Sequence, residues 1–160
     1  MSTTTTQQAE PKHIVFVLNK CIEICMDGEK GYAAAGADVR NPSLKALLQQ
    51  KSKERSDFVV ALQSAIQKLG AFAENEGTAK GTAHRGWMDV RLALEGRNDR
   101  VIVEEWARGE EAALKAYQKA MVRAPLDTLP NDLRTLVQGQ YAAIQAGLDE
   151  ARRQLTMMLH

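Results

Sequence analysis

The sequence of 160 residues contains few of the residues that build β-rich, disulfide-bonded or membrane-spanning proteins. Aromatic residues make up 5% of it, and it has four prolines and two cysteines. So few aromatic residues and prolines, in a chain rich in Ala, Leu, Gln, Glu and Lys, favour helix. We expect no disulfide between the two cysteines, because the cytosol is reducing. The chain also contains no run of about 18 apolar residues, so we expect no membrane span.

The chain also lacks an excess of charge of either sign. It has 21 Lys and Arg residues and 20 Asp and Glu residues, and positive and negative residues are interspersed along the sequence. Because nucleic-acid binders usually carry a basic stripe or tail, we expect neither a nucleic acid nor a membrane as partner. Residues 1–10 are polar and lack the layout of a secretory signal. We therefore expect a disordered leader over 1–10, one domain over 11–160 and a cytoplasmic protein.

Apolar residues at three- and four-residue spacing predict four long helices and one shorter helix. The predicted helices cover residues 11–38, 42–76, 78–94, 99–125 and 130–158. Asn41 stands before a proline and is expected to cap the second helix. Asp99 is expected to cap the fourth helix, and Asp127 or Thr128 the last. Since the connection between the first two helices is short, they should be antiparallel neighbours.

The order and lengths of these helices indicate an all-α fold. A bundle with one long crossover between its second and third core helices is the ferritin-like arrangement. Helix 78–94 would span roughly 25 Å, which is long enough to follow the length of the bundle. The sequence therefore predicts a ferritin-like four-helix bundle with a shorter crossover helix, and a plain five-helix up-and-down bundle is the alternative.

Three motifs lie in order along the chain: DGEKGY at 27–32, HRGWMD at 84–89 and RGEEAALKAY at 108–117. Together they resemble a bacterial family of uncharacterised ferritin-like four-helix-bundle proteins, over roughly residues 12–158. The resemblance implies a ferritin-like fold and a stand-alone cytoplasmic protein. It implies no reaction, because the family has none assigned.

Polar residues interrupt helical stripes that should be wholly apolar. The interrupting residues are Lys51, Glu54, Arg55, Glu110 and Gln140. Burying such groups costs free energy unless they pair with each other or bind a ligand or metal ion. We therefore expect a buried network of ion pairs and hydrogen bonds, formed by Glu54, Arg55, Glu110, Gln140, Tyr32 and Tyr117. Such a network fixes helix register more than it adds stability.

The alternative to this network is a di-iron or di-manganese carboxylate centre acting on oxygen or peroxide. Such a centre needs a carboxylate from each of two helices and Glu-x-x-His from each of the other two. The candidate ligands are Glu29, Glu54, Asp57 and Glu110, with either Asp27 or Glu29 turned inward. However, no histidine stands at ligand spacing in the long helices, and Lys51 and Arg55 would repel a dication. We therefore expect no cofactor, with iron or manganese as the alternative.

Two smaller features have both a packing and a binding interpretation. Cys21 and Cys25 share one helical face and are expected to pack as small core residues, with a soft-metal or redox pair as the alternative. The run 84–87 contains a histidine that could bind an anion at a helix start, although local hydrogen bonding is the simpler interpretation. The sequence thus predicts a non-catalytic stress-related or interaction protein, for which a homodimer is plausible.

Overall fold

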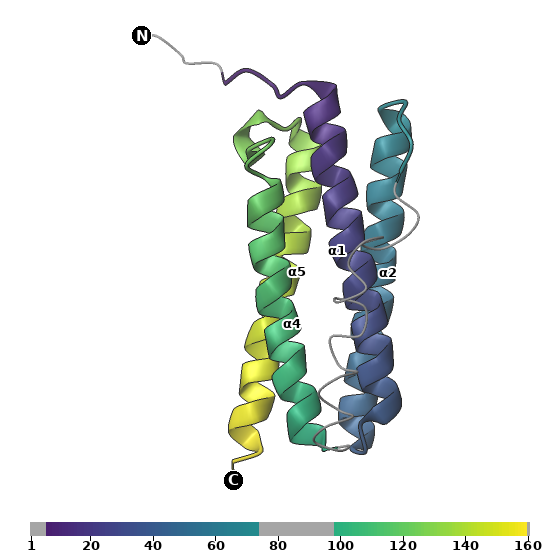
Figure 1. Cartoon of the computed structure of the whole chain (residues 1–160), viewed down its shortest axis with the longest axis vertical. Helices are drawn as coiled ribbons and strands as arrows, with labels where there is room; N and C mark the ends of the chain where they lie inside the picture. The colour runs from purple at the N-terminus through teal and green to yellow at the C-terminus, as the bar shows by residue number, and fades with distance from the viewer. Residues whose placement is uncertain (1–5, 74–97, 160) are drawn as a thin grey trace.

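The computed structural model describes residues 6–73 and 98–159, which form long helices lying lengthwise against one another (Figure 1). The helices are α1 (Pro11–Asp38), α2 (Pro42–Lys68), α4 (Asp99–Ala120) and α5 (Asn131–Met157), and a 3-10 turn, η1 (Leu126–Thr128), precedes α5. No strand occurs within these described ranges. The prediction of an all-α chain with four long helices is therefore confirmed.

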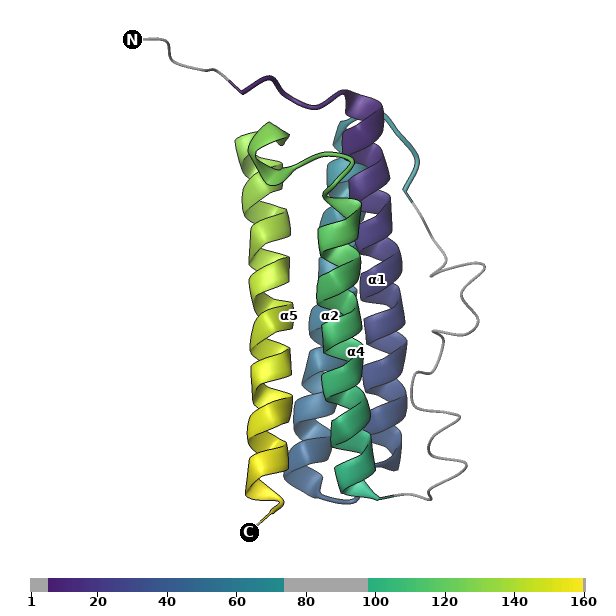
Figure 2. The same ribbon diagram turned by 60° about the vertical axis from the view of Figure 1, so that its left-hand side comes forward.

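The helices pack as two antiparallel pairs. α1 packs against α2, α4 packs against α5, and α1 also packs against α4. α2 and α4 run in the same direction, so the end of α2 and the start of α4 lie at opposite ends of the bundle (Figure 2). The predicted helix 78–94 lies outside the described residues. No helix of the described part is long and apolar enough to cross a membrane.

The turn between α1 and α2 is held by side chains at two helix starts. Asn41 caps α2 as predicted, and its Oδ1 accepts a hydrogen bond of 3.0 Å from the backbone N–H three residues on. The prediction that Asp99 caps α4 is wrong, because Asn98 does so. Asp99 instead accepts hydrogen bonds of 2.8 and 3.0 Å from the backbone N–H groups of Arg40 and Asn41. Its carboxylate therefore ties the start of α4 to the α1–α2 turn.

Two helices end earlier than predicted. α2 ends at Lys68 rather than near 72–76, because the chain turns at Gly70, whose φ of 75° is the left-handed region that favours glycine. α4 ends at Ala120, and hydrogen-bonded turns fill the chain from there toward Pro125.

The start of α5 also differs from the prediction. Asp127 and Thr128 belong to η1, and the residue at the N-cap position of α5 is Pro130. The carbonyl of Thr128 accepts a hydrogen bond of 2.9 Å from the N–H of Ala9, so η1 contacts the segment before α1. Residues 1–5 of the predicted leader lie outside the described part.

The apolar core is divided into two clusters along the bundle axis. Both clusters draw on all four helices. The larger includes Leu18, Cys25, Val59, Leu62, Leu114, Val137 and Ile144. The smaller includes Tyr32, Val39, Leu48, Ile102, Trp106 and Ala151. On α1, α2 and α4, the residues between the two clusters include Gly28, Arg55 and Glu110.

Candidate functional site

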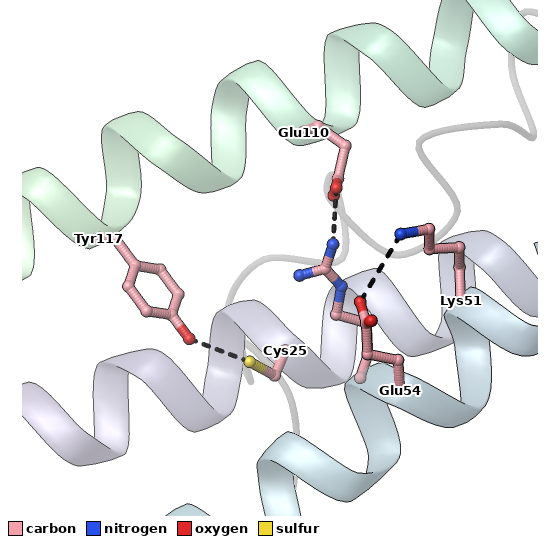
Figure 3. A network of polar contacts seen from close by, with 6 residues as sticks. Cys25, Lys51, Glu54, Glu110 and Tyr117 are labelled. Carbon is pink, nitrogen blue, oxygen red and sulfur yellow. Dashed lines mark hydrogen bonds and ion pairs between the residues drawn. The ribbon is translucent and has the colours of Figure 1, made fainter. Parts of the chain in front are cut away.

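A buried ion pair joins α2 to α4 where the two core clusters meet (Figure 3). Arg55 Nη2 donates a hydrogen bond of 2.6 Å to Glu110 Oε2. The two side chains are only 2% and 5% exposed, so solvent screens the pair little. A charge-assisted bond of this length is among the stronger kinds in proteins. The buried salt bridge predicted from the sequence is therefore confirmed.

A glycine on α5 makes room for this pair. A Cβ atom placed on Gly147 of α5 would collide with Glu110 Oε2 and would lie 3.3 Å from Tyr32 Oη. A Cβ atom placed on Gly28 of α1 would lie 3.5 Å from Arg55 Cγ, which is an ordinary van der Waals contact. The layer therefore involves all four helices: α2 and α4 supply the charges, α5 supplies bare backbone at Gly147, and α1 packs Gly28 and Tyr32 beside the pair.

Burial and the opposite charge act together on the protonation of this layer. Burial raises the pKa of Glu110 above its ordinary value, and the charge of Arg55 partly offsets that rise. Burial lowers the pKa of Arg55, but the charge of Glu110 together with smaller contributions from Tyr32 and Cys25 outweighs it, so the pKa lies above its ordinary value. Burial and then the charge of Glu110 raise the pKa of Tyr32. Each charge of the pair therefore offsets the free-energy cost of burying the other.

The layer also contains buried donors without an acceptor. Neither Arg55 Nε nor Trp106 Nε1 has a hydrogen-bond partner among the described residues. The Trp106 ring packs edge-on against Tyr32, with ring centroids 6.0 Å apart. Because an unmet buried donor costs free energy, this layer contributes more to specifying how the helices face one another than to stability.

A second polar layer forms a hydrogen-bond chain across the bundle. Tyr117 Oη donates to Gln140 Oε1 at 2.9 Å, and Gln140 Nε2 donates to the carbonyl of Phe58 at 3.4 Å. Figure 3 shows the contact between Cys25 and Tyr117, in which Sγ lies 3.1 Å from Oη. Since the one hydroxyl proton goes to Gln140, the thiol is the donor in this contact. The chain of bonds therefore passes from α1 through α4 and α5 to α2.

Both cysteines of α1 lie in the larger core cluster as free thiols. Burial raises the pKa of the Cys25 thiol to about 11, and it raises the pKa of Cys21 as well. Reactivity follows the thiolate, so we expect an aromatic disulfide reagent to label neither thiol in the native protein near neutral pH. Both should react once denaturant is added. Rapid labelling of the native protein would contradict the burial.

The same thiols give the stability of the protein a pH dependence. The folded pKa of Cys25 lies above the ordinary value of 9.0, so its contribution is complete below pH 9 and is lost as pH rises through 11. Equilibrium unfolding at rising pH should show this loss, and a Cys25→Ala variant should show less of it. An identical alkaline slope in the variant would contradict the assignment.

The structure places the remaining candidates away from the centre of the ion pair. Glu54 Oε1 lies 4.0 Å from Lys51 Nζ, and the Glu54 side chain is 33% exposed. Asp57 is exposed and pairs with Lys53 at 3.2 Å, and Glu29 is half-buried on α1. Within residues 6–73 and 98–159, no three His, Cys, Asp or Glu residues gather closely enough to hold a metal ion.

Some residues of the two layers were missed from the sequence. Gly147 was not among the predicted site residues, although a glycine inside a helix is itself a signal of close approach. Cys25 was predicted to be a core residue, with a soft-metal or redox pair as the alternative, and its contact with Tyr117 was not predicted. Glu105 was not considered, yet it is buried and pairs with Arg108 at 3.2 Å. The predicted feature at 84–87 lies outside the described residues.

Comparison with known proteins gives a family and no reaction. A family model described as a domain of unknown function (DUF2383) matches residues 13–123, which include both members of the ion pair. No curated protein matches the chain at a significant level. The chemistry therefore has to be inferred from the geometry of the two polar layers.

Proposed function

The chain belongs to this family of unknown function (DUF2383), and from that premise we propose that it is a non-catalytic, ferritin-like bundle protein. In this proposal the Arg55–Glu110 pair stands where a di-metal centre would otherwise lie. Metal centres of ferritin-like bundles are built in the core from side chains on facing helices. The position of the pair supports the proposal, because it lies in the core between two apolar clusters. The parallel directions of α2 and α4 suit a single long crossover.

The side chains present do not fit a di-metal centre. Glu110 Oε2 is bound by Arg55, and the Glu54 carboxylate has Lys51 as its cationic neighbour. Two fixed cations beside two carboxylates repel a divalent ion and already neutralise its ligands. The usual ligand set also includes two imidazoles, whereas the histidine of the described helices, His13, stands in the first turn of α1. We therefore derive no reaction step through a metal.

Two polar layers that each involve all four helices suit a protein whose outer faces must keep a fixed arrangement. Polar groups buried in a bundle can set register and partner choice between helices, although they add little stability. We propose that this chain acts in the cytoplasm as a stress-related or interaction protein. The stress link rests on analogy with the ferritin-like fold alone. The observation that carries the proposal is the 2.6 Å contact between Arg55 and Glu110.

Metal analysis tests this proposal. The protein should be purified without chelators from cells supplied with iron and manganese, and its metal content measured by plasma mass spectrometry. We expect far less than one metal ion per chain in the parent and in a Glu110→Ala variant, together with a lower melting temperature in that variant. The matched control is Glu111→Ala, which removes an exposed carboxylate paired with Arg152 and should leave the melting temperature nearly unchanged.

The opposite result would favour the rival function. Near-stoichiometric iron or manganese that is lost in Glu110→Ala, but kept in Glu111→Ala, would indicate a di-metal carboxylate protein acting on oxygen or peroxide.

A further inference from the structure

A cavity of about 870 Å³ opens between α1 and α4, the two helices that lie side by side at the front of Figure 1. Its volume falls within the range of about 300–1,000 Å³ that is usual for small-molecule sites. The residues that shape its apolar walls are Ile24 of α1, Ile144 of α5 and four alanines of α4: Ala112, Ala113, Ala116 and Ala120. Because alanine side chains are short, they leave space open between the two helices.

The apolar walls favour an apolar occupant. An apolar cavity holds water poorly. An apolar ligand that fills it gains van der Waals contacts with its walls and the free energy of leaving water. Phe16 and Val122 also line the cavity and are 36% and 79% exposed. An occupant lying over them would remove this apolar surface from water as well.

The charges around the cavity are asymmetric. At the end formed by the start of α1 and the end of α4, the lining residues Lys20, Lys119 and Arg123 face one carboxylate, Glu23. Lys20 pairs with Glu23 at 3.2 Å. Lys119 and Arg123 have no ion pair with a described residue, and the Arg123 guanidinium lies 4.6 Å from the Phe16 ring centroid. This mouth therefore attracts an anion.

The charged residues that line the other end of the cavity already have partners. Glu105 pairs with Arg108, and Arg55 pairs with Glu110. An elongated ligand with one anionic end therefore has one favourable direction, with its charge between the end of α4 and the start of α1.

From these walls and charges we propose that the cavity binds one free fatty acid. Its acyl chain lies along the α4 alanines and Ile24 toward Ile144, and its carboxylate is held by Lys119 and Arg123. A single acyl chain is narrow enough to lie along the space between two packed helices. A peptide helix, which is about 10–12 Å across, is too wide to do so.

Isothermal titration of the full chain with decanoate and dodecanoate, each kept below its micelle concentration, tests this site. We expect one molecule per chain. Each added methylene should tighten binding about fourfold, which corresponds to about 0.8 kcal/mol. Dodecanoate should therefore bind roughly 16-fold more tightly than decanoate, and dodecanoate methyl ester should bind more weakly than the free acid.

Two pairs of variants locate the site. Lys119→Glu should weaken dodecanoate binding roughly tenfold, whereas Lys115→Glu, an exposed position one turn away that does not line the cavity, should change it little. Ala116→Phe should fill the cavity and abolish binding, whereas Ala142→Phe places the same ring on an exposed face of α5. Circular dichroism checks that each variant is folded.

Three results would overturn the proposal. These are no heat of binding up to the solubility of dodecanoate, equal affinities for decanoate and dodecanoate, and equal effects of Lys115→Glu and Lys119→Glu. The charge variants alter only exposed side chains, so this comparison decides the matter even if Ala116→Phe does not fold.

Discussion

Replacing Arg55 with methionine lowers the free energy of unfolding by about 3–5 kcal/mol, because Glu110 is then left buried without its counter-charge. Glu110→Leu has an effect of the same size, since it leaves the Arg55 guanidinium buried without a counter-charge. In a domain of this length, about 1 kcal/mol corresponds to roughly 2–4 °C in melting temperature. Each single variant should therefore melt at least about 6 °C below the parent.

The double variant Arg55→Met/Glu110→Leu should recover most of that loss. Apolar residues of similar volume remove the cost of burying two charges, so its stability should lie within about 1 kcal/mol of the parent or above it. Urea unfolding of the four proteins gives the coupling free energy directly, provided that the m-values agree. A double variant whose loss equals the sum of the two single losses would show that the two side chains do not act as a pair.

Gly147→Ala is expected to destabilise the protein by about 1–3 kcal/mol, although alanine is the better helix former. The added methyl group collides with the Glu110 carboxylate, which Arg55 holds in place. Gly139→Ala on the same helix is the matched control, because a Cβ atom there meets nothing within 4 Å. The control should stabilise the protein by up to about 1 kcal/mol. Thermal unfolding should therefore show a lower melting temperature for Gly147→Ala and a higher one for Gly139→Ala.

A second substitution shows whether the collision is the cause. In a Glu110→Ala background the carboxylate is gone, so adding Gly147→Ala should no longer be destabilising and should approach the effect of Gly139→Ala. If Gly147→Ala stabilises the parent as much as Gly139→Ala does, then α5 does not approach the ion pair as closely as the structure indicates.

The helices could be predicted from the sequence because their signals are local. Apolar spacing marked the four long helices, and Pro11 and Asn41 marked two of their starts. Arg55 and Glu110 could be found as well, because a charged residue in an apolar stripe is conspicuous before any helix is placed beside another.

The pairing between helices could not be predicted, because it depends on the relative heights and rotations of separate helices. Glu110 and Tyr117 are two helical turns apart, roughly 10 Å along α4, so the single cluster expected from the sequence is two layers. Asp99 resembles an N-cap locally, but its carboxylate binds the α1–α2 turn, which is 58 and 59 residues away in the sequence. Only the packed structure shows that Gly147 lies against Glu110.

Crystals grown with excess manganese(II) or iron(II), with anomalous diffraction recorded at the corresponding metal edge, test the central inference most directly. We predict a guanidinium nitrogen of Arg55 on Glu110 and no anomalous peak between Glu54 and Glu110. A metal peak bridging these carboxylates, with Arg55 displaced into solvent, would contradict it.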